Sequence, residues 1–310
     1  MREFDVYAYM RLAALALALT AAGFAAAAST TTAGPGLFDY DASAPLKFKD
    51  KGSVNPKSYP IRVHDISFQG PKSRVTGYLV IPPVKGRKPA VIFMHGSGGN
   101  RTQFLAPAGW VASRGVIGLT LDSPETRSTT PIKPGVPGLH QQRDLTVQAI
   151  VELRRAVDLL TARKDVDPKR IAYVGWSYGA RNGALLAGVE HRIGSYNLMS
   201  GGALPPAEYA KLAPKMYRKA VLQTLTQIDP LRYVARASPS ALFLQDGRRD
   251  GTVPHRALVD LADAASKPKK LRWYKTGHAP NEQEYRDSIA WLSGRLHLHG
   301  VLVKGVRTGP

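Results

Sequence analysis

Short runs of consecutive apolar residues alternate with longer segments of helical spacing over most of this chain. Runs of this length are typical of strands buried on both faces of a sheet. The clearest helical segment is 141–160, where Leu145, Ile150, Leu153 and Val157 recur every three to five residues. Such alternation predicts an α/β fold, with a mostly parallel sheet and helices on both faces. The expected strands are residues 90–94, 116–121, 170–174, 193–199, 241–244 and 271–274.

Two further β-rich segments precede this alternation. Residues 61–68 and 74–81 are separated by the turn-forming run Gln-Gly-Pro-Lys-Ser at 69–73. This arrangement predicts an antiparallel pair of strands at the start of the sheet. The chain has 310 residues, of which 44% are hydrophobic, and shows no internal repeat. One sizeable domain is therefore expected, at residues 59–297.

The first residues have the pattern of a secretory signal peptide. Residues 12–28 are uncharged and rich in Ala and Leu, follow Arg11, and end in small residues typical of a cleavage site. Cleavage near Ala28 predicts a secreted or periplasmic protein, with residues 1–28 removed. A retained transmembrane helix is the alternative, although this segment is barely long enough to cross a bilayer. Glu3 and Asp5 are unusual in a leader, so translation from Met10 is also considered.

The regions that flank the expected domain have a different composition. Residues 29–58 are rich in Ser, Thr, Gly, Pro and Lys, which predicts an irregular lead-in. Residues 298–310 contain Lys304 and Arg307 but no acidic residue. We expect a loosely held basic tail there.

A serine motif follows one of the expected strands. In such sheets, ligands bind beyond the carboxyl ends of the strands. The strand 170–174 is followed by Gly-Trp-Ser-Tyr-Gly at 175–179, and then by a small-residue helical segment. In so tight a turn, side chains at the two glycine positions would collide with neighbouring backbone, and the serine is exposed. The chain lacks cysteine, which excludes disulfides and thiolate nucleophiles. Ser177 is the predicted nucleophile, with a helix-capping role as the alternative.

The partners that Ser177 would need follow later strands. A serine hydroxyl requires a base to take its proton, and the base requires a carboxylate to orient it. The loop after strand 241–244 contains Asp246 and Asp250, and His278 comes directly after strand 271–274 and a short turn. His278 is the predicted base and Asp250 the predicted acid, with Asp246 as a competitor.

Four motifs together resemble the α/β-hydrolase superfamily. They are His-Gly-Ser-Gly-Gly at 95–99, Gly-Trp-Ser-Tyr-Gly at 175–179, Gly-x-x-Asp-x-x-Val-Pro at 247–254 and Gly-His at 277–278. The match is nearest to the dienelactone hydrolase and prolyl-oligopeptidase-like branch and covers roughly residues 59–297. The resemblance implies an α/β-hydrolase fold, and the spacing to Val-Pro favours Asp250. Dienelactone hydrolases use a cysteine nucleophile, so dienelactone itself is not expected to be the substrate.

The resemblance also implies an oxyanion hole made of two backbone N–H groups. One belongs to the residue after the nucleophile, here Tyr178. The other comes from the loop after strand 90–94, where Ser97 is expected to supply it and Gly98 is a close alternative. No metal or cofactor is expected.

The formal net charge of +20 favours an anionic surface or substrate as a partner. A solvated basic surface is the simpler interpretation. No nucleic-acid-binding motif is present, so a nucleic acid partner is not expected. Arg127 and Arg181 are candidates for substrate contact. The basic residues in or near loops at the carboxyl ends of the strands are Arg101, Arg127, Lys133, Arg181, Arg248 and Arg249.

Together these features predict a serine hydrolase that cleaves carboxylic esters, small or polymeric, through an acyl-enzyme. A peptidase of the prolyl-oligopeptidase type is the alternative, but residues 29–58 are too few for the propeller domain common in those enzymes. A non-catalytic binding protein that uses the basic surface is another. The Pro- and Gly-rich loop 123–140 and the insertion 201–232, expected to form short helices, are predicted to shape the substrate pocket.

Overall fold

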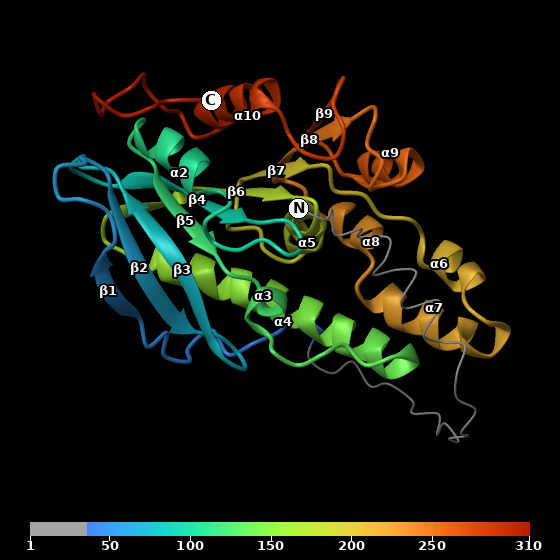
Figure 1. Cartoon of the computed structure of the whole chain (residues 1–310). Coiled ribbons are helices and arrows are strands. Elements are labelled where there is room, and N and C mark those ends of the chain that lie inside the picture. The colour runs from blue at the N-terminus through green and yellow to red at the C-terminus, as the bar shows by residue number, and fades with distance from the viewer. Residues whose placement is uncertain (1–35) are drawn as a thin grey trace.

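The computed structural model describes residues 36–310. Within this part of the chain, the strands form one nine-stranded sheet in the order β1-β2-β3-β5-β4-β6-β7-β8-β9 (Figure 1). The strands are β1 Lys49–Ser53, β2 Arg62–Gln69, β3 Arg74–Ile81, β4 Lys88–Met94, β5 Ile117–Leu121, β6 Val166–Trp176, β7 Ser195–Met199, β8 Ala241–Gly247 and β9 Lys269–Tyr274. The helices are α2 Leu105–Ala112, α3 Pro124–Arg127, α4 Gly135–Thr161, α5 Tyr178–Ala187, α6 Pro206–Leu212, the 3-10 helix η2 Lys215–Tyr217, α7 Arg218–Gln227, α8 Pro230–Val234, α9 His255–Ala264 and α10 Glu282–Arg295.

The sheet changes from antiparallel to parallel along its width. Strands β1, β2, β3 and β5 pair antiparallel. From β5 through β4, β6, β7 and β8 to β9, every neighbouring pair is parallel. This confirms the expected N-terminal antiparallel pair and the mostly parallel sheet, because each of the six apolar runs lies in or overlaps a strand.

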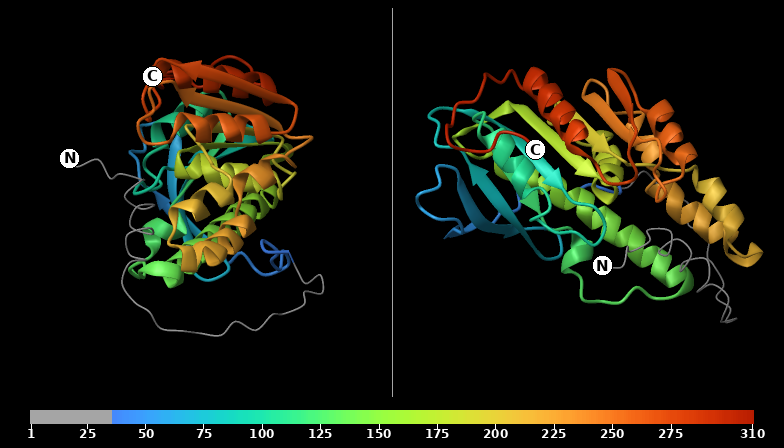
Figure 2. Two further views of the ribbon diagram at one scale, coloured as in Figure 1. Left: turned by 90° about the vertical axis from the view of Figure 1, so that its right-hand side faces the viewer. Right: turned by 45° about the horizontal axis from the view of Figure 1, so that its top comes forward.

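Helices cover both faces of the sheet, as expected (Figures 1 and 2). One core cluster joins the sheet to α4, α5, α8 and α9, and it includes Ile92 and Leu153. The other joins the opposite face to α2 and α10, and it includes Phe93 and Leu292. Neighbouring strand residues such as Ile92 and Phe93 point to opposite faces, so a strand covered on both sides must be apolar at consecutive positions.

The lead-in is more ordered than its composition predicts. Strand β1 pairs with β2 inside the segment 29–58 that was expected to be irregular. Phe38, from the same segment, is only 3% exposed and packs in the first core cluster. Strand β1 is an exposed edge strand with a polar sequence, so the alternation of apolar residues that predicts a strand is absent. Its Lys49 and Lys51 also hinder pairing with other chains.

The C-terminal tail is also held more firmly than expected. The N–H groups of Leu302 and Val303 donate to the carbonyl oxygen of Ser113, at 2.9 and 3.0 Å. Val303 is buried in the second core cluster, and Arg114 donates to the carbonyl oxygen of Thr308 at 2.7 Å. The expectation of a loosely held tail at 298–310 is therefore wrong, because a few apolar residues among its basic ones complete the packing around α2.

The two segments expected to shape the pocket differ in outcome. The insertion 201–232 does form short helices, namely α6, η2, α7 and the start of α8. The stretch 123–140 is less of a loop than predicted, since α3 occupies part of it and α4 already begins at Gly135. Pro137 lies in the first turn of α4, where no intrahelical donor is needed and proline is tolerated.

The expected signal peptide at residues 1–28 lies outside the described residues. In residues 36–310, none of the helices combines the length and the apolar character that crossing a bilayer would require.

Candidate active site

Ser177 occupies a sharp turn between β6 and α5. Its backbone has φ 54° and ψ −112°, a left-handed conformation that is costly for a residue with a side chain. The turn is possible because its flanks are glycines. A Cβ atom at Gly175 would overlap the backbone of Gly179, and one at Gly179 would overlap the carbonyl oxygen of Met94. The collisions inferred from the sequence are thus confirmed, whereas the expected exposure of the serine is not, because Ser177 is only 8% exposed.

The structure brings Ser177, His278 and Asp250 together, although up to about a hundred residues separate them in sequence. The hydroxyl oxygen of Ser177 lies 2.9 Å from Nε2 of His278. Nδ1 of the same ring lies 2.8 Å from Oδ2 of Asp250. This linear arrangement lets the imidazole accept the serine proton at one nitrogen while the carboxylate holds the other nitrogen in its protonated form.

Asp250 is fixed for this role by its own loop. Its carboxylate is 1% exposed, and Oδ1 accepts hydrogen bonds from the N–H groups of Thr252 and Val253 at 2.8 and 2.9 Å. One oxygen is therefore held by the backbone while the other faces the histidine. The spacing of the Asp-x-x-Val-Pro motif explains this geometry, because the loop after Asp250 must turn back to present its N–H groups.

Asp246, the competing acid, lies four residues earlier, in β8 itself. It is 1% exposed, and neither carboxyl oxygen has a hydrogen-bond partner within residues 36–310. Burial raises the pKa of Asp246 well above its usual range, and the nearby carboxylates of Asp250 and Glu284 raise it further. Asp246 makes no hydrogen bond to His278, so the preference for Asp250 over Asp246 agrees with the geometry.

The loop after β4 supplies backbone donors near the nucleophile. Residues 96–99 form a turn in which the N–H of Gly99 donates to the carbonyl oxygen of Gly96 at 3.0 Å. Gly98, the third of these four residues, has φ 70°, a conformation that favours glycine. The N–H of Gly96 is already bound to Gln103 at 2.9 Å. The N–H groups of Ser97 and Gly98 have no acceptor in the described part of the chain, which leaves both alternatives for the second oxyanion donor in place.

His95 holds the shape of this loop. The N–H of Ser123 donates to its Nε2 at 3.0 Å, so its Nδ1 carries the proton and donates to the carbonyl oxygen of Gly96 at 2.7 Å. Burial lowers the pKa of His95, which keeps the ring neutral as this bonding pattern requires. The other expected donor, the N–H of Tyr178, is the first of α5 and has no intrahelical acceptor.

Trp176 connects the turn that carries Ser177 to the loop that carries His278. Its indole Nε1 donates to the backbone carbonyl oxygen of His278 at 3.0 Å, and the two rings lie 5.3 Å apart. The same indole packs so tightly on Gly96 that a Cβ atom there would overlap it. No local sequence pattern indicates these contacts of Trp176, because its partners lie in other loops. Gln103, which fixes Gly96, was missed for the same reason.

The two arginines expected to contact the substrate have different surroundings. Arg127 donates to Oε1 of the buried Glu152 at 2.6 Å and also to the carbonyl oxygen of Asp122. Its charge is therefore committed to holding α3 against α4, and the structure does not support a role in substrate contact. Arg181 lies in the first turn of α5, and its side chain forms no ion pair within residues 36–310. Its contact with a substrate stays a prediction.

The remaining basic residues of the expected set divide in the same way. Arg101 pairs with Asp65 at 2.9 Å and lies near Asp122. Arg248 lies over the ring of Trp273, and Arg249 donates to the carbonyl oxygen of Lys275 at 2.6 Å. Arg101 and Arg127 are therefore neutralised by acidic partners, whereas Arg248 and Arg249 are held in place but keep their charge.

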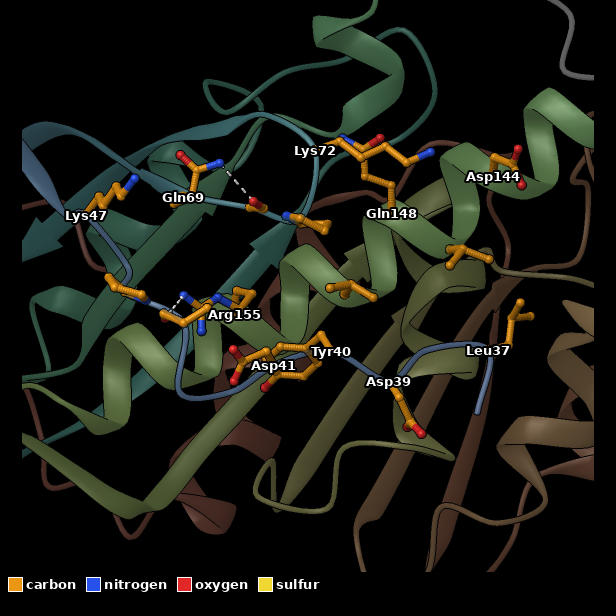
Figure 3. A pocket seen from close by; sticks show the side chains of 16 residues that line it. Leu37, Asp39, Tyr40, Asp41, Lys47, Gln69, Lys72, Asp144, Gln148 and Arg155 are labelled. Atoms are coloured by element: carbon orange, nitrogen blue, oxygen red, sulfur yellow. Dashed lines mark hydrogen bonds between the residues drawn. The ribbon is translucent and has the colours of Figure 1, made fainter. Parts of the chain in front are cut away.

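A groove of about 650 Å³ lies away from these residues (Figure 3). It is bounded by residues 37–47, by the turn between β2 and β3, and by α4, where Asp144, Gln148 and Arg155 face it. Arg155 donates to the carbonyl oxygen of Ala44 at 2.6 Å and so anchors the N-terminal segment to α4. None of the expected site residues lines this groove. Residues 36–310 also contain no cluster of three His, Asp or Glu side chains suited to a metal ion.

Comparisons with known proteins agree with the architecture. No protein-family model matches the chain. The structure is similar to an acetyl xylan esterase from Paenibacillus sp. R4, with a TM-score of 0.70 and 20% sequence identity over 84% of this chain and 91% of that one. The chain has the α/β-hydrolase fold.

Two further similarities can be placed beside this α/β-hydrolase fold. Acetyl xylan esterase 1 from Thermoanaerobacterium sp. has a TM-score of 0.69 and 17% identity, over 83% of this chain and 90% of that one. Among curated sequences, the Escherichia coli O157:H7 protein YfhR, described as uncharacterized, is 24% identical over 183 residues. That match spans 58% of this chain and 59% of YfhR, so it covers little more than half of either protein.

Proposed function

We propose that this protein is a serine hydrolase that cleaves carboxylic esters through an acyl-enzyme. The observation that carries the proposal is the hydrogen-bonded series Ser177–His278–Asp250, with 2.9 and 2.8 Å between the relevant atoms. The solved structures with a similar fold that are named as acetyl xylan esterases support an ester as the substrate class.

In the proposed first step, the Ser177 hydroxyl attacks the ester carbonyl carbon while Nε2 of His278 takes its proton. Asp250 stabilises the imidazolium that forms. The negative charge on the former carbonyl oxygen is held by the N–H of Tyr178 and by that of Ser97, or of the adjacent Gly98. His278 then gives the proton to the leaving alcohol. Water attacks the acyl-enzyme with His278 again as base, which releases the acid and restores Ser177.

Acetyl esters of carbohydrates are the first substrates to try, given the names of the similar structures. Helices α6 and α7 follow β7, the strand paired with the one that leads to Ser177, and we propose that this insertion helps to select the acyl or alcohol group. A polymeric ester would need an open approach to this edge, whereas a small one would not. A panel of acetylated oligosaccharides and simple acetates distinguishes these cases.

The test uses p-nitrophenyl acetate and a fluorophosphonate probe with the wild-type chain and Ser177→Ala. The wild type should release p-nitrophenol and gain one probe adduct by intact mass. Ser177→Ala should lose the adduct and nearly all turnover, with an unchanged circular dichroism spectrum. Ser293→Ala, on α10 and bonded only to a helix carbonyl, is the matched control and should behave like the wild type. Wild-type turnover no higher than that of Ser177→Ala would refute the proposal, and rates equal to the uncatalysed background in both would favour a binding protein.

A further inference from the structure

The insertion between β7 and β8 contains an exposed helical turn, which lies between α6 and α7. Helices α6 and α7 pack on each other through Ala210, Ala213 and Val221, which are 6–7% exposed. The turn that joins them leaves Leu212 73% and Met216 70% exposed, the highest values among the large apolar side chains that the structure describes as exposed. In Figure 1 and in the right panel of Figure 2, α6 and α7 form the margin of the molecule opposite β1. We call residues 211–219 the cap tip.

The cap tip is strongly basic. It has the sequence Lys-Leu-Ala-Pro-Lys-Met-Tyr-Arg-Lys, with four cationic residues and no acidic one. Lys211 pairs with Glu208 at 2.8 Å, but both side chains are well exposed, and such pairs are weak. Lys215 and Lys219 form no ion pair within residues 36–310. Two projecting apolar side chains are thus surrounded by positive charge that the protein does not neutralise.

The backbone of the cap tip is held in place. Nε of Arg218 donates to the carbonyl oxygen of Ala213 at 3.1 Å, and a second guanidinium nitrogen donates to that of Lys211, also at 3.1 Å. Arg218 therefore joins the start of α7 to the end of α6. Because these two hydrogen bonds hold the turn in one conformation, Leu212 and Met216 are displayed on a fixed scaffold. They do not belong to a flexible loop that could fold back and bury them.

The chemistry of the cap tip favours one kind of partner. A second copy of this chain, related by a twofold axis, would bring two basic tips face to face, which like-charge repulsion opposes. A dissolved polyanion would satisfy the lysines but leave Leu212 and Met216 in water. An anionic lipid surface satisfies both, because lysine ammonium groups reach the headgroups while apolar side chains enter the boundary with the acyl chains.

We propose that the cap tip docks this protein onto anionic lipid surfaces, with Leu212 and Met216 inserted and Lys215 and Lys219 on the headgroups. Docking would set the carboxyl edge of the sheet beside the surface, because α6 begins a few residues after β7, whose Met199 accepts a hydrogen bond from the Ser177 N–H at 2.8 Å. The proposal goes beyond the proposed function. It concerns binding alone and holds whichever reaction Ser177 supports.

The test is flotation of the full chain with vesicles of phosphatidylcholine alone and of phosphatidylcholine mixed with phosphatidylglycerol. The wild type should bind the anionic vesicles more tightly. Leu212→Ser/Met216→Ser removes the apolar contact, and Lys215→Glu/Lys219→Glu reverses the charge; each should weaken that binding by roughly tenfold or more. All four side chains are exposed, so the unfolding temperature should not change. Residues 1–35 are the same in every variant, so differences between variants measure the cap tip.

A matched control changes one exposed apolar residue and two basic residues elsewhere. Val54→Ser/Lys49→Glu/Lys57→Glu alters exposed residues in and near β1 and reverses two charges, as the cap-tip variant does, so it should bind like the wild type if net charge alone is not responsible. Equal binding by all variants would overturn the proposal. Loss with the charge reversal but not with Leu212→Ser/Met216→Ser would also overturn it, in favour of a polyanion site. If the wild type does not bind vesicles but sediments as a dimer, and Leu212→Ser/Met216→Ser sediments as a monomer, the cap tip is a self-association surface and the proposal is overturned.

Discussion

Two aspartates near the end of β8 lie in opposite surroundings. The loop that carries Asp250 gives that carboxylate two backbone N–H donors and a histidine, so its charge is fully supported. The strand end that carries Asp246 gives its carboxyl group no hydrogen-bond partner within residues 36–310, and two acids lie nearby. Both side chains are almost completely buried. Two carboxyl groups that are equally buried therefore differ widely in the hydrogen bonds that they receive.

The carboxylate of Asp250 is surrounded by hydrogen-bond donors, whereas the surroundings of Asp246 favour the uncharged carboxyl group. The pKa of Asp246 is raised, first by burial, so the folded protein holds its proton where the unfolded chain would release it. Glu152 is a third case, buried like Asp246 but paired with Arg127. Glu284 is a fourth, with one oxygen bound to the N–H of Asn281.

The largest expected effect is on turnover. Asp250→Asn replaces the acceptor at Nδ1 of His278 with a group that can donate, which favours the wrong tautomer and leaves Nε2 unable to take the serine proton. We expect kcat on p-nitrophenyl acetate to fall by about 10⁴-fold, with little change in KM. Steady-state kinetics measure this. Asp246→Asn is the paired variant, and its kcat should stay within a few-fold of the wild type. A comparable loss in both variants would mean that Asp246 shares the acid's role.

The second effect is on stability. Arg127→Met should lower the free energy of unfolding by roughly 3 kcal/mol, because Glu152 then lies buried without its cation, as Asp246 does. Urea titration followed by circular dichroism measures the change. The double variant Arg127→Met/Glu152→Gln should recover part of the loss by removing the isolated acid. If Arg127→Met is as stable as the wild type but has a higher KM for anionic esters alone, Arg127 is a substrate contact after all.

The third effect depends on pH. An acid whose folded pKa is raised stabilises the protein fully below its unfolded pKa, near 3.8 for aspartate, and this contribution is lost as pH rises through the folded pKa. Over that window one proton changes stability by about 1.4 kcal/mol per pH unit. Asp246→Asn resembles the protonated acid at every pH. Its unfolding temperature should exceed that of the wild type near neutrality, and the two should converge near pH 4. Parallel curves would show that Asp246 is ionised in the folded protein.

The smallest effect concerns the start of α10. Asn281 accepts from the N–H of Glu284 at 3.0 Å, while Glu284 accepts from the N–H of Asn281 at 3.0 Å, and together they form a capping box. Asn281→Ala should cost about 1 kcal/mol and lower the unfolding temperature by about 2–4 °C. Asn281→Asp keeps the acceptor and should retain the wild-type value. Thermal scans of the three proteins decide this, and an unchanged Asn281→Ala would show that Glu284 alone holds the helix start.

The positions of the main strands along the chain and those of the three site residues followed from the sequence because each depends on a local pattern, whereas the order of the strands in the sheet did not. Buried strands are mostly apolar at consecutive positions, the tight serine turn requires glycines, and the Asp-x-x-Val-Pro spacing places donors on Asp250. Asn281 and Glu284 follow the same rule, because their spacing of three residues is typical of a helix start and they form the capping box of α10. Each of these signals lies within a few residues of the feature that it predicts.

The features that were not predicted depend on contacts between distant segments. β1 becomes a strand because β2 offers it an edge, and the tail is held because Val303 meets the cluster around α2. Arg127 looked available for a substrate because its partner Glu152 lies 25 residues away on another helix. The bond from the Trp176 indole to the His278 carbonyl likewise joins residues that no local pattern connects.

That indole bond has a consequence for how such a protein can change. It joins Trp176, the neighbour of Ser177, to the backbone of His278, so part of what sets the spacing between the hydroxyl and the imidazole lies outside the insertion after β7. Changes in the outer part of that insertion, at α6 and α7, are therefore expected to leave the alignment of Ser177 with His278 in place.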